Sequence, residues 1–467
     1  VDAASRGLST VLVERGDFAS GTSSKSTKLI HGGVRYLRDG HVGLVAQSLR
    51  ERERVLRNAP GLVREIDFLI PTRRPFSRAF YAAGLRFYDA LSGGAGATRV
   101  LSRAAASARV PGVSSDRLRG GVLYEDNQFD DARLVLALAR TAADLGAVVL
   151  NYAVAEGLLS RDGRAAGVVV RDRESERVLE IPARVVINAC GVHADALRRL
   201  DDPAAAPVVR ASRGAHVVLD AAFLPGETAL LVPRTDDGRV LFLIPWRGRV
   251  LVGTTDTPCE PVEDPAASPE DVSYLLAHTS KVLARAPAIG DVKSAFAGLR
   301  PLLARGGANT ASLRRDHRVV VSPRGLVTIT GGKWTTYRAM AEDAIDRAVA
   351  SGGLAAPPSR TTRLAIHSGD AAVWTNDPIE RAAIAGSGEG DGIEAFVRAA
   401  VRDDMARTLE DVMARRSRAL FLDARGSVQL ARVVARTMAL ELSRDSAWVE
   451  SQVSEFTAKA ARWLPAR

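Results

Sequence analysis

The stretch that decides the fold is Ser20–Leu37, SGTSSKSTKLIHGGVRYL, which is rich in hydroxyl, glycine and basic residues. It follows Thr10–Arg15, an apolar run that is typical of a strand and contains the acidic Glu14 near its end, and it precedes a helical pattern. A strand ending in a carboxylate, followed by a loop of small donors, can hold a nucleotide, with the carboxylate on the ribose hydroxyls and the loop at the diphosphate. We therefore expect a dinucleotide site rather than an ordinary solvated loop.

The composition is that of a globular protein with more than one domain. The chain has 467 residues, which is too long for one core, so two or three domains are expected. Its residues are 46% hydrophobic and 25% charged, as is ordinary for a globular protein. Its two cysteines, Cys190 and Cys259, lie far apart and indicate a reducing compartment without a disulfide framework. No run approaches the roughly 20 apolar residues of a membrane span.

The formal net charge of +10 raises the question of an anionic partner. The arginines are scattered and aromatic residues make up only 5%, which argues against nucleic acid. An anionic membrane surface or an anionic substrate explains the charge better.

The chain opens unusually for a dinucleotide fold. Val1–Leu8 reads as the end of a helix with a glycine stop, whereas such folds normally begin with a strand and a G-x-G-x-x-G loop. We expect that the first strand and the glycine loop are missing, roughly 20–30 residues or half a βαβ unit.

Hydrophobic periodicity predicts the remaining elements. A helix with one buried stripe is expected over Val42–Asn58, and the aromatics within 72–119 are expected to pack helices into a core. Asp130 should cap a helix to about Leu145, with Asp131 as a dipole contributor. Alternating strands are expected over 148–184, a buried parallel strand over 184–191, an antiparallel sheet over 207–301, and helices from about residue 372 onward.

Several motifs occur together in one order along the chain. Ser20–Leu37 is similar to the signature of the FAD-dependent, aerobic, quinone-linked glycerol-3-phosphate dehydrogenases. The segments that match the family elsewhere are Asp130–Leu134, Gly253–Asp256, Gly298–Leu302, Arg315–His317 and Gly331–Arg338. No single motif is decisive, but the ordered set spans nearly the whole chain.

The resemblance implies an α/β fold of three parts. A Rossmann-like FAD-binding domain of the D-amino-acid-oxidase type is expected from residues 1–71, 120–206 and 318–353. An antiparallel-sheet substrate domain is expected from 72–119 and 207–317, and a small helical C-terminal domain from 354–467.

The resemblance also implies the reaction: oxidation of sn-glycerol 3-phosphate to dihydroxyacetone phosphate by hydride transfer to FAD, with electrons passing to a membrane quinone. We expect a cytoplasmic protein attached peripherally to the cytoplasmic face of the membrane, with a homodimer left open. Neither a metal site nor a nucleic-acid partner is expected.

Site residues follow motif by motif from the resemblance. The substrate is a phosphate ester that guanidinium forks suit, and the expected binding residues are Arg35, Tyr36, Arg300, Arg315 and Lys333. The expected catalytic residues are His31 or His216 as the base that takes the hydroxyl proton, with Arg300 and Lys333. Cofactor contacts are expected from Glu14, Thr22, Ser23, Ser24, Ser26, Lys28, Leu29, Gly32, Gly191, Gly331, Gly332, Lys333, Thr335 and Thr336.

Three rival functions remain open on the sequence. An amine or 2-hydroxyacid oxidase of the same superfamily is one, although the arginines and the Ser/Thr-Lys loop favour a phosphate substrate. An oxygen-reducing glycerophosphate oxidase is the second, since the acceptor depends on access to the flavin. The third is a cofactor-free scaffold or binding protein.

Overall fold

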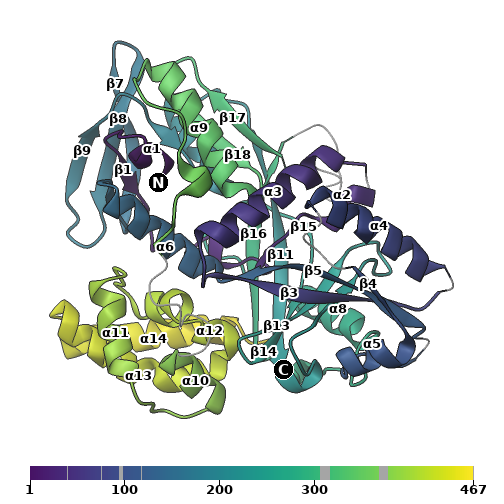
Figure 1. Cartoon of the computed structure of the whole chain (residues 1–467). Coiled ribbons are helices and arrows are strands. Elements are labelled where there is room, and N and C mark those ends of the chain that lie inside the picture. Colours follow the sequence, from purple (N-terminus) through teal and green to yellow (C-terminus); the bar gives the residue numbers. More distant parts are fainter. Residues whose placement is uncertain are drawn as a thin grey trace.

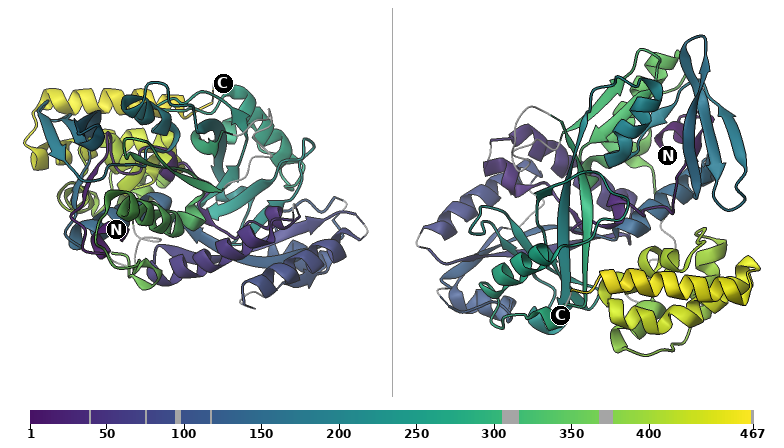
Figure 2. Two further views of the ribbon diagram at one scale, coloured as in Figure 1. Left: turned by 90° about the horizontal axis from the view of Figure 1, so that it is seen from above. Right: turned by 180° about the vertical axis from the view of Figure 1, so that it is seen from behind.

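The computed structural model describes residues 1–38, 40–74, 76–93, 98–116, 118–304, 316–367 and 377–465, apart from the side chains of Arg35 and Arg38. Figure 1 shows three regions: an α/β part around α9 and β7–β9, a long curved sheet flanked by α3, α4, α5 and α8, and a helical bundle of α10–α14. The view from behind in Figure 2 shows the bundle lying beside the far end of the sheet, below the α/β part. The predicted α/β fold with a helical C-terminal domain is confirmed.

A ten-stranded sheet forms the middle of the molecule. Its strands run in the order β15-β11-β14-β13-β12-β3-β5-β2, with β16 paired to β11 and β4 paired to β5. Every pairing is antiparallel except the one between β12 and β3. The strands are β2 (Leu29–Ile30), β3 (Val63–Thr72), β4 (Arg99–Leu101), β5 (Gly120–Phe129), β11 (Val209–Asp220), β12 (Ala229–Val232), β13 (Leu241–Trp246), β14 (Arg249–Gly253), β15 (Thr257–Pro258) and β16 (Ser294–Leu303).

One part of the predicted domain division is wrong. Residues 63–71 and 120–129 were expected in the cofactor domain, but β3 and β5 belong to the ten-stranded sheet because β3 continues it from β12. Periodicity identifies a strand without identifying its partner, so it could not assign these two strands to a sheet.

The α/β part contains two separate pieces of parallel sheet. One joins β1 (Val11–Val13) to β6 (Val148–Leu150), and the other joins β10 (Ile187–Asn188) to β18 (Val327–Gly331), which β17 (His317–Val321) extends. Among the described residues, the two pieces are separate sheets with no strand pairing between them. The alternating strands predicted over 148–184 include β7 (Ala153–Arg161), β8 (Arg164–Asp172) and β9 (Val178–Pro182), which form a small antiparallel sheet.

The helices follow the predicted pattern. The helix predicted over Val42–Asn58 is α3, and Asp130 caps α6 by accepting from the Arg133 N–H at 3.0 Å. The bounds are α1 (Asp2–Ser5), α2 (Val34–Arg38), α3 (Val42–Asn58), α4 (Ser77–Leu91), α5 (Arg103–Arg109), α6 (Asp131–Asp144), α7 (Ala194–Asp201), α8 (Pro269–Ser280), α9 (Tyr337–Gly352), α10 (Pro378–Ala385), α11 (Ile393–Arg402), α12 (Ala419–Leu422), α13 (Ala424–Leu442) and α14 (Ser446–Arg462). Shorter helical turns are η1 (Thr22–Ser24), η2 (Gly191–His193), η3 (Ala221–Phe223), η4 (Ile289–Asp291), η6 (Trp334–Thr336), η7 (Thr361–Arg363) and the π-helix η9 (Asp411–Arg416).

Helix α4 corrects the prediction that the aromatics of 72–119 fill a core. Its buried face carries Ala82, Leu85 and Tyr88, whereas Phe80 and Phe87 are 64% and 48% exposed. Phe76, just before the helix, is 89% exposed. The aromatics occur near helical spacing, but on both faces of one helix, and the apolar run alone did not show which face packs inward.

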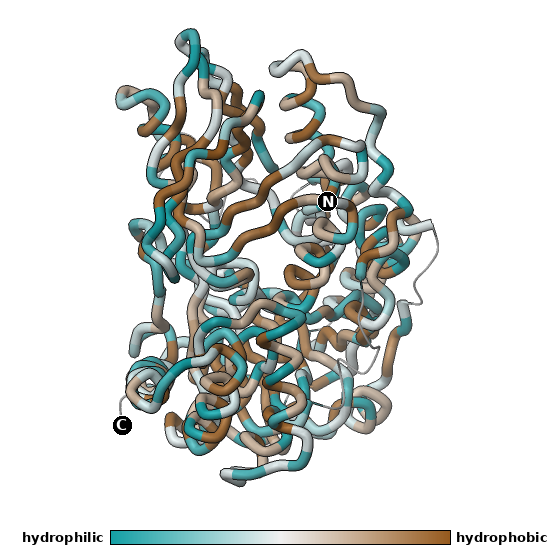
Figure 3. Tube along the Cα trace, turned by 90° about the vertical axis from the view of Figure 1, so that its left-hand side faces the viewer, coloured by the Kyte–Doolittle hydropathy of each residue, from teal (hydrophilic) through white to brown (hydrophobic). Residues whose placement is uncertain are grey.

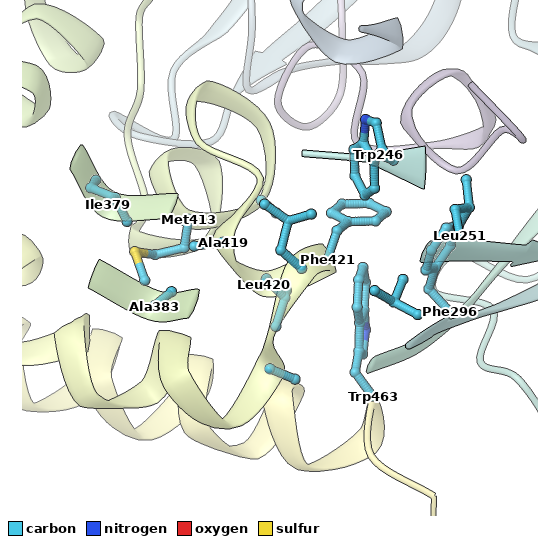
Figure 4. Close-up of a cluster of buried hydrophobic side chains, with 14 of the residues drawn as sticks. Trp246, Leu251, Phe296, Ile379, Ala383, Met413, Ala419, Leu420, Phe421 and Trp463 are labelled. Atoms are coloured by element: carbon cyan, nitrogen blue, oxygen red, sulfur yellow. The ribbon is translucent and has the colours of Figure 1, made fainter. Parts of the chain in front are cut away.

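The largest core joins the sheet to the helical bundle. Figure 4 shows Trp246 of β13 and Phe296 of β16 beside Phe421 and Trp463 of the C-terminal domain, and the ring centroids of Phe296 and Phe421 lie 4.7 Å apart. In Figure 3 long hydrophobic stretches, coloured brown, run along extended segments of the trace. No helix of the described residues is both long and apolar enough to cross a membrane.

Candidate functional site

The Ser20–Leu37 loop is hydrogen-bonded to the Gly331–Arg338 motif, about 300 residues away in the chain. The Trp334 indole N–H donates to the Ser23 carbonyl at 3.0 Å. The Thr335 hydroxyl donates to the His31 carbonyl at 3.0 Å and accepts from the His31 N–H at 3.2 Å. Two motifs that the sequence predicted to share one site therefore meet directly.

Two further motifs, from the ten-stranded sheet, contact the same loop or each other. The Thr22 hydroxyl donates to the Leu299 carbonyl of β16 at 2.6 Å. One residue further, Arg300 donates from Nη2 to the Thr254 hydroxyl at 2.9 Å and to the Thr255 carbonyl at 3.0 Å. The loop and the motifs of residues 253–256 and 298–302 thus form one continuous set of contacts.

A cavity of about 1620 Å³ opens between these elements. Four residues predicted for the site line it, namely Leu29, His31, Tyr36 and Arg300. Since ligand cavities usually measure about 300–1,000 Å³, this one has room for more than one small molecule. Hydroxyl and carboxylate side chains of the quoted motifs that were not among the predicted site residues also line it: Thr27, Thr254, Thr255 and Asp256.

Arg300 is held as an oriented cation on the cavity wall. Its side chain is 18% exposed, and Nη1 lies 3.6 Å from the Asp256 carboxylate. On the neighbouring strand, a Cβ at Gly214 would overlap the guanidinium, so that glycine leaves the space Arg300 occupies. The guanidinium therefore has a fixed direction on the cavity wall, and a guanidinium fork suits an anion such as a phosphate.

Tyr36 and Lys333 lie together beside the same loop. The Lys333 ammonium is 5.3 Å from the Tyr36 ring centroid, and Gly33, with φ +83°, brings the backbone close to both. The side chain of Arg35 lies outside the described structure, although its backbone belongs to α2. Arg315 lies in 305–315, outside the described residues.

The two candidate bases occupy different positions. His31 lies on the cavity wall, with its ring 6.3 Å from that of Phe242. His216 is 2% exposed, stacks on Phe296, and its Nε2 lies 3.0 Å from the hydroxyl of Thr27, which does line the cavity. Burial, followed by the charges of Lys28 and Arg300, lowers the pKa of His216 well below its usual value, so this imidazole is neutral.

Glu14 and Gly191, predicted for the nucleotide end, are close in space although they come from separate sheets. The carboxylate of Glu14 accepts from the Gly16 N–H at 3.0 Å. Burial, followed by the charge of Glu14, raises the pKa of Cys190, the residue before Gly191. Burial raises the pKa of Glu14. Gly191 has φ +56° and open space where a Cβ would lie, so a ligand can approach its backbone.

The donor set fits the diphosphate and ribose of a dinucleotide such as FAD. Gly21 in the loop also has open space at its Cβ position, and Glu14 supplies a fixed carboxylate at the end of β1. Gly331 and Gly332 have φ +80° and +77°, which glycine alone adopts readily, and they lead into η6 and α9 as predicted. Thr336 donates to the Lys333 carbonyl and so fixes that turn.

Several loop residues that were predicted to contact the cofactor have side chains that form contacts inside the protein. The Lys28 ammonium is fully buried against Asp131 at 2.7 Å, and the Ser26 hydroxyl donates to the same carboxylate. Thr22 is bonded to β16, and a Cβ at Gly32 would overlap the Tyr88 hydroxyl. Because the Lys28 side chain is buried in this ion pair, its backbone is the part that a ligand could reach. Ser24 is also buried, and its carbonyl accepts from Arg418.

Asp131 is more than the dipole contributor that was predicted. Its carboxylate accepts from Lys28 and from Arg418 at 2.8 Å, and all three side chains are fully buried. Arg418 was missed by sequence reasoning, because 287 residues separate it from Asp131 and no spacing rule connects them.

A sequence profile described as FAD dependent oxidoreductase matches residues 1–346, and the one described as the C-terminal domain of alpha-glycerophosphate oxidase matches residues 327–449. The chain therefore belongs to the FAD dependent oxidoreductase family, and FAD is the cofactor of that family, as the sequence predicted.

Within the family the chain is similar to glycerol-3-phosphate dehydrogenases. It is 40% identical over 387 residues to the mitochondrial enzyme of Mus musculus, covering 79% of this chain and 53% of that protein. It is 44% identical over 375 residues to the enzyme of Mycobacterium leprae, covering 79% and 64%. The glycerol-3-phosphate dehydrogenase of Bacillus halodurans, solved with FAD, superposes with a TM-score of 0.79 at 28% identity, covering 99% of this chain and 92% of that one. The chain spans about half the length of the mammalian relative.

Proposed function

We propose that this protein oxidises sn-glycerol 3-phosphate to dihydroxyacetone phosphate. The observation that carries the proposal is the oriented Arg300 on a cavity wall that also contains His31. The identity of 40–44% to glycerol-3-phosphate dehydrogenases supports the same substrate.

Arg300 binds the substrate phosphate in this proposal. Its contacts with Thr254 and Thr255 hold one edge of the fork, and the charge-assisted bonds of a guanidinium suit phosphate oxygens. Lys333, beside Tyr36, supplies a second positive charge near the loop. Bound FAD would accept the hydride from C2, and the residues named here position the substrate and take up its proton.

His31 takes the hydroxyl proton. It lies on the cavity wall, whereas His216 reaches the cavity only through Thr27 and is strongly desolvated. His31→Asn should lower kcat by about 100-fold or more, since general bases contribute about 10²–10⁴. His216→Asn is the matched variant: if it lowers kcat this much and His31→Asn does not, the proton passes through Thr27 to His216.

A substrate panel tests the activity itself. With an artificial dye as acceptor, glycerol 3-phosphate should be turned over with stoichiometric dihydroxyacetone phosphate, while glycerol and glycine should react poorly. Preference for glycine or another amino acid would place the protein with the amine oxidases and refute the proposed substrate.

We further propose that the electron acceptor is a membrane quinone, reached by peripheral attachment at the cytoplasmic face. Support comes from α4, whose outer face exposes Phe80 and Phe87 next to the exposed Arg78 and Arg86. Apolar rings flanked by arginines suit the interface of an anionic bilayer. Phe80 and Phe87 also line the cavity, so a lipid-soluble acceptor would enter from that surface.

Attachment and acceptor can be tested separately. Phe80→Asp should abolish low-salt sedimentation with vesicles containing phosphatidylserine, whereas Leu440→Asp, at a 77% exposed position on α13, should not. Sedimentation of Phe80→Asp at the wild-type level would refute the α4 surface. Peroxide formed in amounts equal to the oxidised substrate, with no quinone reduction, would identify an oxidase instead.

A further inference from the structure

The inner side of the Ser20–Leu37 loop, and the residues just before it, contact the C-terminal domain through charged side chains. Asp17 is ion-paired with Arg415 and Arg416 of η9. Lys25 lies 3.3 Å from Asp264, which also pairs with Arg462 of α14 at 2.6 Å. The helical domain therefore touches this segment at more than one point.

The most buried of these contacts is centred on Arg418. Its Nη2 donates to the Asp131 carboxylate at 2.8 Å and to the Ser24 carbonyl at 3.2 Å. Lys28 donates to the same two acceptors, the Asp131 carboxylate at 2.7 Å and the Ser24 carbonyl. Arg418 thus ties a loop carbonyl and the first turn of α6 to the C-terminal domain, where its Nη1 donates to the Ala414 carbonyl at 2.8 Å.

The surroundings make this network sensitive to any missing member. Two cations share one carboxylate with no solvent exposure. The Arg418 guanidinium carbon lies 4.3 Å from the Phe421 ring centroid, and the Lys28 ammonium lies 4.9 Å from it. Removing one partner from a buried ion pair is strongly unfavourable, whereas the intact pair adds little stability, so such groups are better suited to fixing a conformation.

The network is adjacent to the candidate site. Thr27, which precedes Lys28, lines the cavity and contacts His216. Ser24 and Ser26 belong to the part of the loop whose backbone would face the cofactor diphosphate, and Ser26 is bonded to Asp131 through both its N–H and its hydroxyl. A displaced Ser24 carbonyl or Lys28 would therefore move both the backbone donors and Thr27.

We propose that Arg418 is a positioning residue through which the C-terminal domain holds Ser24–Lys28 in the conformation that binds FAD and presents Thr27 to the cavity. The proposal rests on the assignment of this loop to the flavin, which belongs to the proposed function. It assigns the helical domain a role in the reaction, although among its described residues none lines the cavity.

The test uses flavin-loaded protein, from which FAD is removed and titrated back while absorbance is recorded. Arg418→Gln should raise the Kd for FAD by about tenfold or more and lower kcat more than it raises KM, because a loosened loop misplaces groups near the reacting atoms. Arg418→Lys should show an intermediate Kd, since one ammonium cannot reproduce the fork. Arg432→Gln removes an exposed ion pair with Glu450 in the same domain and should leave Kd and kcat unchanged.

Two results would overturn the proposal. One is an Arg418→Lys or Arg418→Gln protein that is folded by circular dichroism and keeps the wild-type Kd for FAD and the wild-type kcat, whatever its Tm. The other applies if Arg418→Gln does not fold: Asp131→Asn then replaces it, and a folded Asp131→Asn protein with the wild-type Kd for FAD would overturn the proposal. Because Kd is read without substrate, failure of the wild type to oxidise glycerol 3-phosphate would refute the proposed function and leave this test intact.

Discussion

Replacing Arg300 by alanine should lower kcat/KM for glycerol 3-phosphate by about 10- to 200-fold. Charge-assisted hydrogen bonds contribute roughly 1.5–3 kcal/mol each, and each 1.4 kcal/mol is a factor of ten. The guanidinium is already oriented by Thr254 and Thr255, so it contributes to binding without a large ordering cost. The substitution would also take away the cation that lies 3.6 Å from the Asp256 carboxylate.

The assay compares glycerol 3-phosphate with glycerol at one dye concentration. Wild-type protein should react poorly with glycerol, and Arg300→Ala should change that rate little, because glycerol has no phosphate for Arg300 to bind. Arg300→Lys should recover only part of the activity on the phosphate ester. Equal loss on both substrates would show that Arg300 is structural and would refute its assignment to the phosphate.

Two further predictions follow from the geometry. Gly214→Ala places a Cβ where the Arg300 guanidinium lies, so kcat/KM for glycerol 3-phosphate should fall by about tenfold or more while the activity on glycerol changes little; equal loss on both would contradict it. Burial lowers the pKa of Lys28 to about 7 from 10.5, so the unfolded chain binds the extra proton between those values and stability rises with pH there. When the free energy of unfolding is measured in urea from pH 7 to 9.5, Lys28→Met should remove up to about 1.4 kcal/mol per pH unit of its rise with pH. The same dependence on pH in Lys28→Met and wild type would contradict a lowered pKa of Lys28.

Local elements were predictable where one helix or loop carries its own signal. The apolar spacing of Val45, Leu49 and Val55 defines α3, and the carboxylate of Asp130 defines the start of α6. These signals act within a few residues, so the sequence contains them whole.

Partners distant in sequence were less predictable. The sheet that contains β3 depends on its pairing with β12, and the partner of Asp131 is Arg418. The exposed face of α4 depends on which side packs inward, and Phe80 gives no sign of that by itself. The motif order still predicted that His31 and Arg300 line one cavity, because the resemblance supplied the long-range information that spacing lacks.

Anaerobic titration of the flavin-loaded protein with sn-glycerol 3-phosphate tests the central claim most directly. One equivalent should bleach the oxidised-flavin absorbance and yield one equivalent of dihydroxyacetone phosphate. If glycerol 3-phosphate leaves the spectrum unchanged while dithionite bleaches it, the flavin is competent and glycerol 3-phosphate is not its substrate.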